Sequence, residues 1–175
     1  MRPSLQNQNL FVDNSNVFKE NQPLIEIYTD GSSRGNPGPG GYGVILLAGK
    51  LKKELSEGFR LTTNNRMELM AVIAALKALK KTDLNIRIYS DSSYVVKAVM
   101  EGWLNKWMRT NFKGGIKNSD LWIEYFERAK KQHIQFKWVK GHAENAMNNR
   151  CDQLATQAAD GRKLSVDSGY EKLSS

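Results

Sequence analysis

Four acidic residues occupy positions that ordinary structural roles explain poorly when the four are taken together. Asp30 and Asp91 each follow a short run in which apolar residues alternate, as in a strand. Glu68 lies at the edge of the apolar stripe of a predicted helix, and Asp152 lies close to such a stripe near the end of the chain. Ligands of open α/β sheets collect just beyond strand ends. We therefore expect these carboxylates to converge on one pocket if the two strands are neighbours.

Carboxylates gathered in one pocket favour a cation-dependent chemistry. Their mutual repulsion raises their pKa values and destabilises the fold unless cations intervene. Hard divalent ions such as Mg²⁺ prefer oxygen ligands of this kind. Two such ions roughly 4 Å apart can activate water, orient a phosphodiester and stabilise the leaving oxygen. Each acid alone also has an ordinary explanation, as a turn residue, a helix cap or a solvated surface group.

The elements that must position these acids follow from the spacing of apolar residues. Alternation predicts strands, and a period of three to four residues predicts helices. The glycine- and proline-rich run 31–41 predicts a turn-rich connection, so the first strand is expected to end at Asp30. Strands are expected at 24–29, 42–47, 52–60, 85–90 and 134–138, and helices at 67–80, 93–100, 121–131 and 146–160. A three-strand meander followed by β–α alternation indicates an α/β fold with a mixed sheet flanked by helices.

The length of 175 residues fits one domain with its own core. Residues 1–23 are rich in Asn and Gln and carry no periodic apolar face, so we expect a flexible polar leader. Residues 24–160 are expected to form the folded domain. Gly161 is expected to stop the last helix and to leave residues 161–175 as a loosely held C-terminal tail.

Composition narrows the classes of function. The net charge of +8 favours polyanionic partners, although many basic proteins bind nothing in particular. No apolar run approaches the roughly 18 residues of a membrane span, and the leader lacks a secretory apolar block. The single cysteine, Cys151, excludes an internal disulfide and a multi-cysteine zinc site. We therefore expect a cytoplasmic monomer with no membrane association and no obligate protein partner.

The segment 103–118 combines cations with aromatic residues and contains no acid. Cations interleaved with aromatic rings are typical of surfaces that bind a nucleic-acid strand. Trp103 and Trp107 lie four residues apart, so one of them is expected to pack in a helix. We expect Trp103 to contact nucleic acid and Trp107 to be mainly structural. The cations are Lys106, Arg109, Lys113 and Lys117.

Several runs of the sequence, in order, carry a specific resemblance. They are YTDGS at 28–32, GNPGPGGYG at 35–43, TTNNRMEL at 62–69, SDS at 90–92, WVKGH at 138–142 and NRCDQLA at 149–155. Together they closely resemble bacterial ribonuclease H type 1 over residues 24–160. The resemblance implies a five-stranded ribonuclease H-like fold. It also implies an endonuclease that hydrolyses the RNA strand of RNA–DNA hybrids to 5′-phosphate and 3′-hydroxyl ends.

The resemblance also assigns roles to particular residues. It implies two Mg²⁺ ions held by Asp30, Glu68, Asp91 and Asp152, with Asp30 shared between them and with Mn²⁺ as a substitute ion. His142 matches a loop histidine that assists proton transfer or product release, a role that suits a side chain titrating near neutral pH.

Recognition of the hybrid is implied at a further set of positions. The protein must sense the 2′-hydroxyl and the groove shape, and asparagine amides both donate and accept hydrogen bonds. Asn64 and Asn65 have an alternative role as helix caps. The implied groove contacts are Asn36, Asn64, Asn65 and Glu68, the implied contacts to a DNA phosphate are Thr63 and Asn118, and the implied contacts of the basic segment are Trp103 and Lys106.

The sequence departs from the family pattern at two places. Ser93 replaces a glutamine that touches substrate in well-known bacterial members, and the loop 143–147 differs in composition.

Two other functions are alternatives to a ribonuclease H activity. A catalytically silent hybrid-binding module would require a missing carboxylate, and none is missing. A nuclease of the same fold that acts on DNA, such as a transposase or resolvase, is disfavoured by the paired Asn64 and Asn65.

Overall fold

The computed structural model describes residues 17–141 and 145–174. Its elements, in chain order, are β1 (Leu24–Ser33), β2 (Gly38–Ala48), β3 (Leu51–Thr62), α2 (Asn64–Ala78), β4 (Asn85–Ser90), α3 (Ser93–Met100), α4 (Trp103–Arg109), α5 (Ser119–Ala129), β5 (His133–Trp138), α6 (Ala146–Ala159) and α7 (Ser168–Ser174). The predicted strand over 85–90 and helix over 93–100 are confirmed, and the other predicted helices lie within three residues of their observed bounds.

The five strands form one sheet in the order β3-β2-β1-β4-β5. β1 and β3 pair antiparallel with β2, while β1 with β4 and β4 with β5 are parallel. This arrangement confirms the predicted mixed sheet, a meander extended by two parallel strands. Each parallel connection carries a helix across the sheet, as β–α units require.

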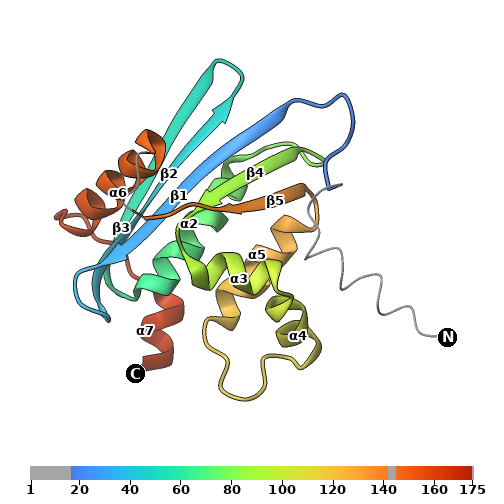
Figure 1. The fold of residues 1–175 in the computed structure, drawn as a ribbon. Coiled ribbons are helices and arrows are strands. Elements are labelled where there is room, and N and C mark those ends of the chain that lie inside the picture. The colour runs from blue at the N-terminus through green and yellow to red at the C-terminus, as the bar shows by residue number, and fades with distance from the viewer. Residues whose placement is uncertain (1–16, 142–144, 175) are drawn as a thin grey trace.

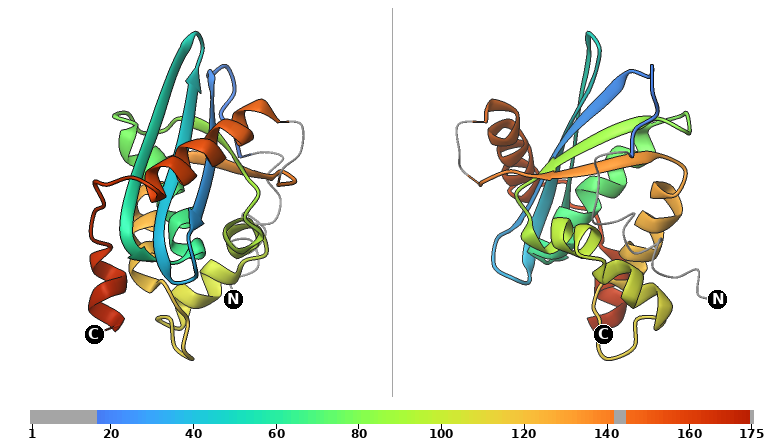
Figure 2. Two further views of the ribbon diagram at one scale, coloured as in Figure 1. Left: turned by 90° about the vertical axis from the view of Figure 1, so that its left-hand side faces the viewer. Right: turned by 45° about the vertical axis from the view of Figure 1, so that its right-hand side comes forward.

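Helices cover both faces of the sheet (Figure 1). α6 lies against β1, β2 and β3 on one face, whereas α2, α3 and α5 pack on the other (Figure 2). The larger apolar core lies on the α2 side, around Ile27, Ile88, Val72 and Trp122, all buried. Among the residues that the structure describes, no helix combines the length and hydropathy needed to cross a bilayer.

α6 approaches the sheet closely because glycines lie beneath it. A Cβ atom added at Gly43 would lie 2.3 Å from the Cys151 carbonyl oxygen, and one at Gly58 would lie 2.1 Å from the Ala158 oxygen. Only residues without side chains leave room for the helix backbone at these positions. Cys151 is fully buried in this contact, as predicted for a small apolar residue.

The prediction that the first strand ends at Asp30 is wrong. β1 continues to Ser33 and β2 begins at Gly38, so most of the glycine-rich run is strand and Asp30 pairs with Gly43 inside the ladder. The glycines serve close packing as well as turning. β-Sheet pairing therefore prevails over the turn preference of the local sequence.

The prediction of a loosely held C-terminal tail is also wrong. The Ser165 amide donates to the Gly58 carbonyl at 2.8 Å, and the Arg60 amide donates to the Ser165 carbonyl at 2.9 Å, which extends the edge of β3. Asp167 is buried against Arg66, and α7 follows beside the same edge. Apolar periodicity gave no signal because the segment is held by polar contacts.

The described part of the leader is also attached to the domain. The Lys19 amide donates to Asn85 Oδ1 at 2.9 Å, and the Asn85 amide group donates back to the Lys19 carbonyl at 2.8 Å. Residues 17–23 therefore pack at the start of β4, where the sequence predicted flexibility. Residues 1–16 lie outside the described residues.

Candidate active site

The divergence of β1 and β4 creates the opening of the site. Their parallel pairing ends at Tyr28 and Tyr89, and each acid lies two residues further along its chain, at Asp30 and Asp91. The backbone of Asp91 is held in place by Trp138, whose indole N–H donates to the Asp91 carbonyl oxygen at 3.3 Å. The two carboxylates therefore face each other where the order of strands reverses, the place where α/β sheets bind ligands.

A close contact between β1 and α2 adds the third acid. A Cβ atom at Gly31 would lie 2.3 Å from the Glu68 backbone nitrogen, so the glycine lets the helix rest directly on the strand. The N-terminus of α2 is fixed by Thr63, whose hydroxyl accepts a hydrogen bond from the Arg66 amide at 3.3 Å. Thr63, rather than Asn64 or Asn65, is therefore the cap of this helix.

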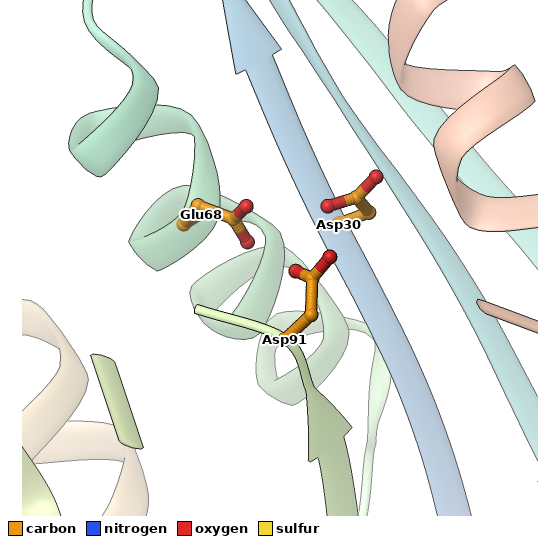
Figure 3. Close-up of side chains that lie close together, drawn as sticks. All are labelled: Asp30, Glu68 and Asp91. Atoms are coloured by element: carbon orange, nitrogen blue, oxygen red, sulfur yellow. The ribbon is translucent and has the colours of Figure 1, made fainter. Parts of the chain in front are cut away.

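Asp30, Glu68 and Asp91 form what we name the acid cluster. Ligand oxygens of the three residues lie within 4.8 Å of one another. Figure 3 shows the side chains pointing toward one another from β1, from α2 and from the end of β4. Asp152, on α6, lines the same pocket without belonging to the cluster of three.

The acid cluster is electrostatically strained. Burial raises the pKa of Asp30 to about 8, and the charges of Asp91 and Asp152 act in the same direction. Burial also raises the pKa of Glu68 well above its usual range, followed by the charges of Asp30 and Asp91. Among the described residues, Glu68 Oε2 is buried without a hydrogen-bond partner. The cluster thus lacks positive charge and leaves a buried acceptor unused.

The pocket has polar walls that sequence reasoning found only in part. Its lining includes the predicted Asn64 and Asn65, and also Ser93, which departs from the family pattern. Tyr94 and Asn148 also line it and were not predicted. Asn148 precedes Asp152 by four residues, so helical spacing was a usable signal for it, whereas Tyr94 had none.

Comparison with known proteins decides the family. The sequence model of the RNase H family matches residues 22–160. The chain belongs to the ribonuclease H family. It is 48% identical to the ribonuclease H of Syntrophus aciditrophicus over 156 residues, which are 87% of this chain and 90% of that protein. It is 51% identical to the ribonuclease H of Thermoanaerobacter sp. over 144 residues, 80% of this chain and 92% of that one. The predicted kinship with the bacterial type 1 enzymes is confirmed, and the chain is a nuclease.

Solved ribonuclease H structures share the fold. The crystal structure of LC9-RNase H1, a type 1 RNase H with the type 2 active-site motif, superposes with a TM-score of 0.73 at 33% identity, over 88% of this chain and 82% of that chain. LC11-RNase H1 in complex with an RNA/DNA hybrid gives a TM-score of 0.61 at 27% identity, over 78% of this chain and 96% of that chain.

Other predicted residues lie at the surface of this ribonuclease H. Asn64 and Asn65 are exposed and line the pocket of the acid cluster, and the exposed Asn36 accepts a hydrogen bond from the Asn64 backbone amide. α4 presents Trp103, which is 41% exposed, and the exposed Lys106. Trp107 is partly buried, with its ring 5.9 Å from that of Trp122, which agrees with its predicted structural role.

Two predicted features cannot be located in the ribonuclease H domain as described. His142 lies outside the described residues, together with residues 143 and 144 of the loop whose composition departs from the family. Asn145 resumes the described chain as the cap of α6, and its side chain accepts from the Met147 and Asn148 amides, each at 3.1 Å. The helix that carries Asp152 is therefore fixed at its N-terminus.

Proposed function

We propose that the chain is an endonuclease that hydrolyses the RNA strand of RNA–DNA hybrids with two Mg²⁺ ions and leaves 5′-phosphate and 3′-hydroxyl ends. The observation that carries the proposal is the convergence of Asp30, Glu68 and Asp91 within 4.8 Å in a pocket walled by Asn64 and Asn65. Membership of the ribonuclease H family supports hydrolysis of hybrids.

The residues of the pocket fit divalent cations. All the candidate ligands are carboxylate oxygens, the donors that Mg²⁺ prefers. The buried and unpartnered Oε2 of Glu68 requires either a proton or a cation. A bound cation would also offset the repulsion that raises the pKa values of Asp30 and Glu68. We assign Asp30, Glu68, Asp91 and Asp152 as the ligands, with Asp30 shared between two ions.

The protein's own structure holds the proposed metal ligands in place. When bound, the two ions would supply an activated water and stabilise the leaving 3′-oxygen. Asp30 is rigid because it lies inside the β1–β2 ladder, opposite Gly43. Asp91 is fixed by the indole of Trp138, and Glu68 by its helix. Such preorganised ligands avoid the cost of reordering the site during each turnover.

His142 and Asp152 complete the proposed catalytic set. Asp152 lines the pocket from α6 and increases the pKa of Asp30 by its charge. His142 follows Gly141, which approaches Asp91 so closely that an added Cβ would lie 2.9 Å from Asp91 Oδ2. A histidine one residue further is suited to move a proton at the leaving group or to assist product release.

The orientation of two asparagine amides supports recognition of the minor groove. Asn64 Oδ1 accepts a hydrogen bond from the backbone N–H of Ser33 at 2.7 Å, and Asn36 Oδ1 accepts one from the backbone N–H of Asn64 at 3.1 Å. With their oxygens engaged, both side chains present N–H groups outward. Such donors match the acceptors of the groove and the oxygen of a 2′-hydroxyl. Asn65 and Glu68 are proposed to act with them.

The DNA strand is proposed to lie across the other side of the site. Thr63 and Asn118 would hold one of its phosphates, and Trp103 and Lys106 on α4 would contact the strand further along. Support comes from the exposure of Trp103 and Lys106 and from the bonds that Thr63 and Asn118 share with Arg66. Aromatic rings and cations together bind single strands without sequence preference.

The test is gel-resolved cleavage of one 3′-labelled RNA, presented in a DNA hybrid, in an RNA duplex and alone. We expect cleavage of the hybrid only, with Mg²⁺ and not with EDTA. Phosphatase treatment should shift the products, because each labelled fragment begins with a 5′-phosphate. Asp30→Asn should bind the hybrid without cutting it. Binding without cleavage by the unaltered protein would favour a silent module, and cleavage of DNA would favour a related nuclease.

A further inference from the structure

Arg66 is the centre of a buried polar network that we name the arginine hub, formed with Asp120, Asp167 and Asn118. Arg66 is only 1% exposed. Its five N–H bonds match five acceptor contacts. These are Nε to Asp167 Oδ2 at 2.7 Å, Nη2 to Asp167 Oδ1 at 2.9 Å and to Asp120 Oδ2 at 2.7 Å, and Nη1 to Asp120 Oδ1 at 2.9 Å and to Asn118 Oδ1 at 3.3 Å.

The hub joins three segments that are distant in the sequence. Arg66 belongs to the first turns of α2, two residues before Glu68. Asn118 and Asp120 belong to the start of α5, and Asp167 belongs to the C-terminal segment, which we define as residues 165–172. The family match ends at residue 160, so this segment lies beyond the part of the chain that the family model covers.

Both proposed DNA-phosphate contacts are bonded to Arg66. Thr63 Oγ1 accepts from the Arg66 backbone amide, and Asn118 Oδ1 accepts from the guanidinium, each at 3.3 Å. A fixed Arg66 therefore fixes the separation between the two contacts. A lysine could supply the charge but could not replace the planar set of five donors.

The hub also orients the amide of Asn118. Its oxygen is taken by Arg66, and its nitrogen donates to the Tyr94 hydroxyl at 3.0 Å. The second N–H of that nitrogen is then available to a phosphate oxygen. The opposite amide orientation would place an oxygen beside the phosphate and repel it, so the guanidinium selects the orientation that binds.

The C-terminal segment completes the hub from outside. Asp167 is 3% exposed and is itself held by the Thr62 hydroxyl at 2.7 Å and the Tyr170 amide at 3.3 Å. Gly169 packs against the hub so closely that a Cβ there would lie 2.1 Å from Asp120 Oδ2. The guanidinium is thus drawn between Asp167 and Asp120, and loss of either charge lets it move.

We infer that the C-terminal segment is a positioning element for substrate binding, acting through Asp167 and Arg66 on Asn118. The inference rests on the proposed function, because it takes Asn118 as a contact to the DNA strand. Asp167 is a positioning residue that touches no substrate. Its effect should appear in the affinity for the hybrid and hardly in the rate of the bound complex.

The experiment compares KM and kcat for one hybrid among Asp167→Asn, Asn118→Ala, the double variant and the control Glu171→Gln. Glu171 lies in the same segment and its side chain bonds the exposed Arg60, so Glu171→Gln removes an equal charge from the segment and keeps the five contacts of Arg66. All assays run well below the lowest melting temperature. We expect Asp167→Asn and Asn118→Ala each to raise KM about 3- to 10-fold, the value of one phosphate hydrogen bond, with kcat within about 2-fold. The double variant should match Asn118→Ala alone, and Glu171→Gln should resemble the unaltered protein.

Three results would overturn the inference. A folded Asp167→Asn with unchanged KM, beside a raised KM in Asn118→Ala, refutes it and leaves the proposed function intact. Multiplying effects in the double variant mean that the two residues act independently. An unchanged KM in Asn118→Ala removes the proposed phosphate contact and the inference together, while hybrid cleavage itself stands. If Asp167→Asn is too unstable to assay, Gly169→Ala applies the same test by displacing Asp120.

Discussion

Two groups of carboxylates flank the first turns of α2, and they solve the same electrostatic problem in opposite ways. The acid cluster contains three carboxylates and no cation, and the pKa values of Asp30 and Glu68 are raised. In the arginine hub, burial alone would lower the pKa of Arg66, but its hydrogen bonds to Asp120 and Asp167 hold that pKa above its usual range. Arg66 likewise lowers the pKa of Asp120 against the effect of burial. The arginine hub carries its cation within the chain, whereas the acid cluster is proposed to take its cations from solution. Only the acid cluster could therefore gain or lose its positive charge during a catalytic cycle.

The largest expected effect is on catalysis in the acid cluster. Asp30→Asn should reduce cleavage of the hybrid by about 10³-fold or more, because loss of a shared metal ligand removes several kcal/mol of transition-state stabilisation. Initial rates at saturating Mg²⁺ measure it. The hybrid affinity in EDTA serves as the control and should hardly change. A rate close to that of the unaltered protein would refute the metal assignment.

The next effect concerns stability in the arginine hub. Arg66→Met should lower the free energy of unfolding by about 3–5 kcal/mol, because it leaves the buried Asp167 without its partner. Denaturant unfolding measures the change, and Mg²⁺ should not reverse it.

Asp30→Asn should change the free energy of unfolding in the opposite direction. In metal-free protein it should stabilise the fold by about 1–3 kcal/mol, since it relieves repulsion within the acid cluster. If Arg66→Met and Asp30→Asn changed the free energy of unfolding in the same direction, the contrast between the arginine hub and the acid cluster would be refuted.

The pH dependence of metal-free protein should expose the acid cluster. The pKa of Asp30 is raised in the folded state to about 8, so between about pH 4 and pH 8 the folded protein binds more protons than the unfolded chain. The contribution of Asp30 to stability is therefore fully present below pH 4 and is lost as the pH rises toward 8. Thermal melts in EDTA should show this loss as a decrease of several degrees in Tm.

Mg²⁺ should restore the lost Tm most strongly at the alkaline end, where the carboxylates are ready to bind it. Asp30→Asn is the matched control, and both the pH slope and the response to Mg²⁺ should shrink in it. A metal-free Tm that rises between pH 5 and 8 in the unaltered protein, and not in this variant, would contradict the raised pKa.

The smallest expected effect lies within the hub. The side chain of Asp167 is 2% exposed and that of Asp120 is 39% exposed. Asp120→Asn should therefore cost only about 1 kcal/mol, because water screens the pair, whereas Asp167→Asn should cost about 2–3 kcal/mol. Parallel denaturant titrations of the two variants measure the difference. Equal losses would mean that burial does not govern the strength of these pairs.

Much of the acid cluster could be predicted from the sequence. The two strands that lead to Asp30 and Asp91 and the helix that carries Glu68 follow from local periodicity, and the topology brings them together. The extension of β1 past Asp30 did not follow, because glycines in a strand resemble glycines in a turn. Gly31 makes room for α2 and Gly43 makes room for α6, and no local pattern contains either approach.

The arginine hub was beyond local reasoning for a different cause. Asp167 lies 101 residues from Arg66, and its neighbours show no apolar period. A buried ion pair between single residues has no sequence signature comparable with an amphipathic stripe. Thr63 as the helix cap was predictable in kind, because several capping residues adjoin one another, but only the fold selects among them.

The glycines beneath α6 act as a gauge for the fourth carboxylate. Gly43 is the sheet partner of Asp30 and also the floor on which the Cys151 backbone rests, one residue before Asp152. The height of the helix above the sheet, and hence the reach of Asp152 toward Asp30, is set by the absence of a single methyl group. An alanine at position 43 would push α6 away from the sheet. Asp152 would then lie further from Asp30, and catalysis in the pocket would be weakened.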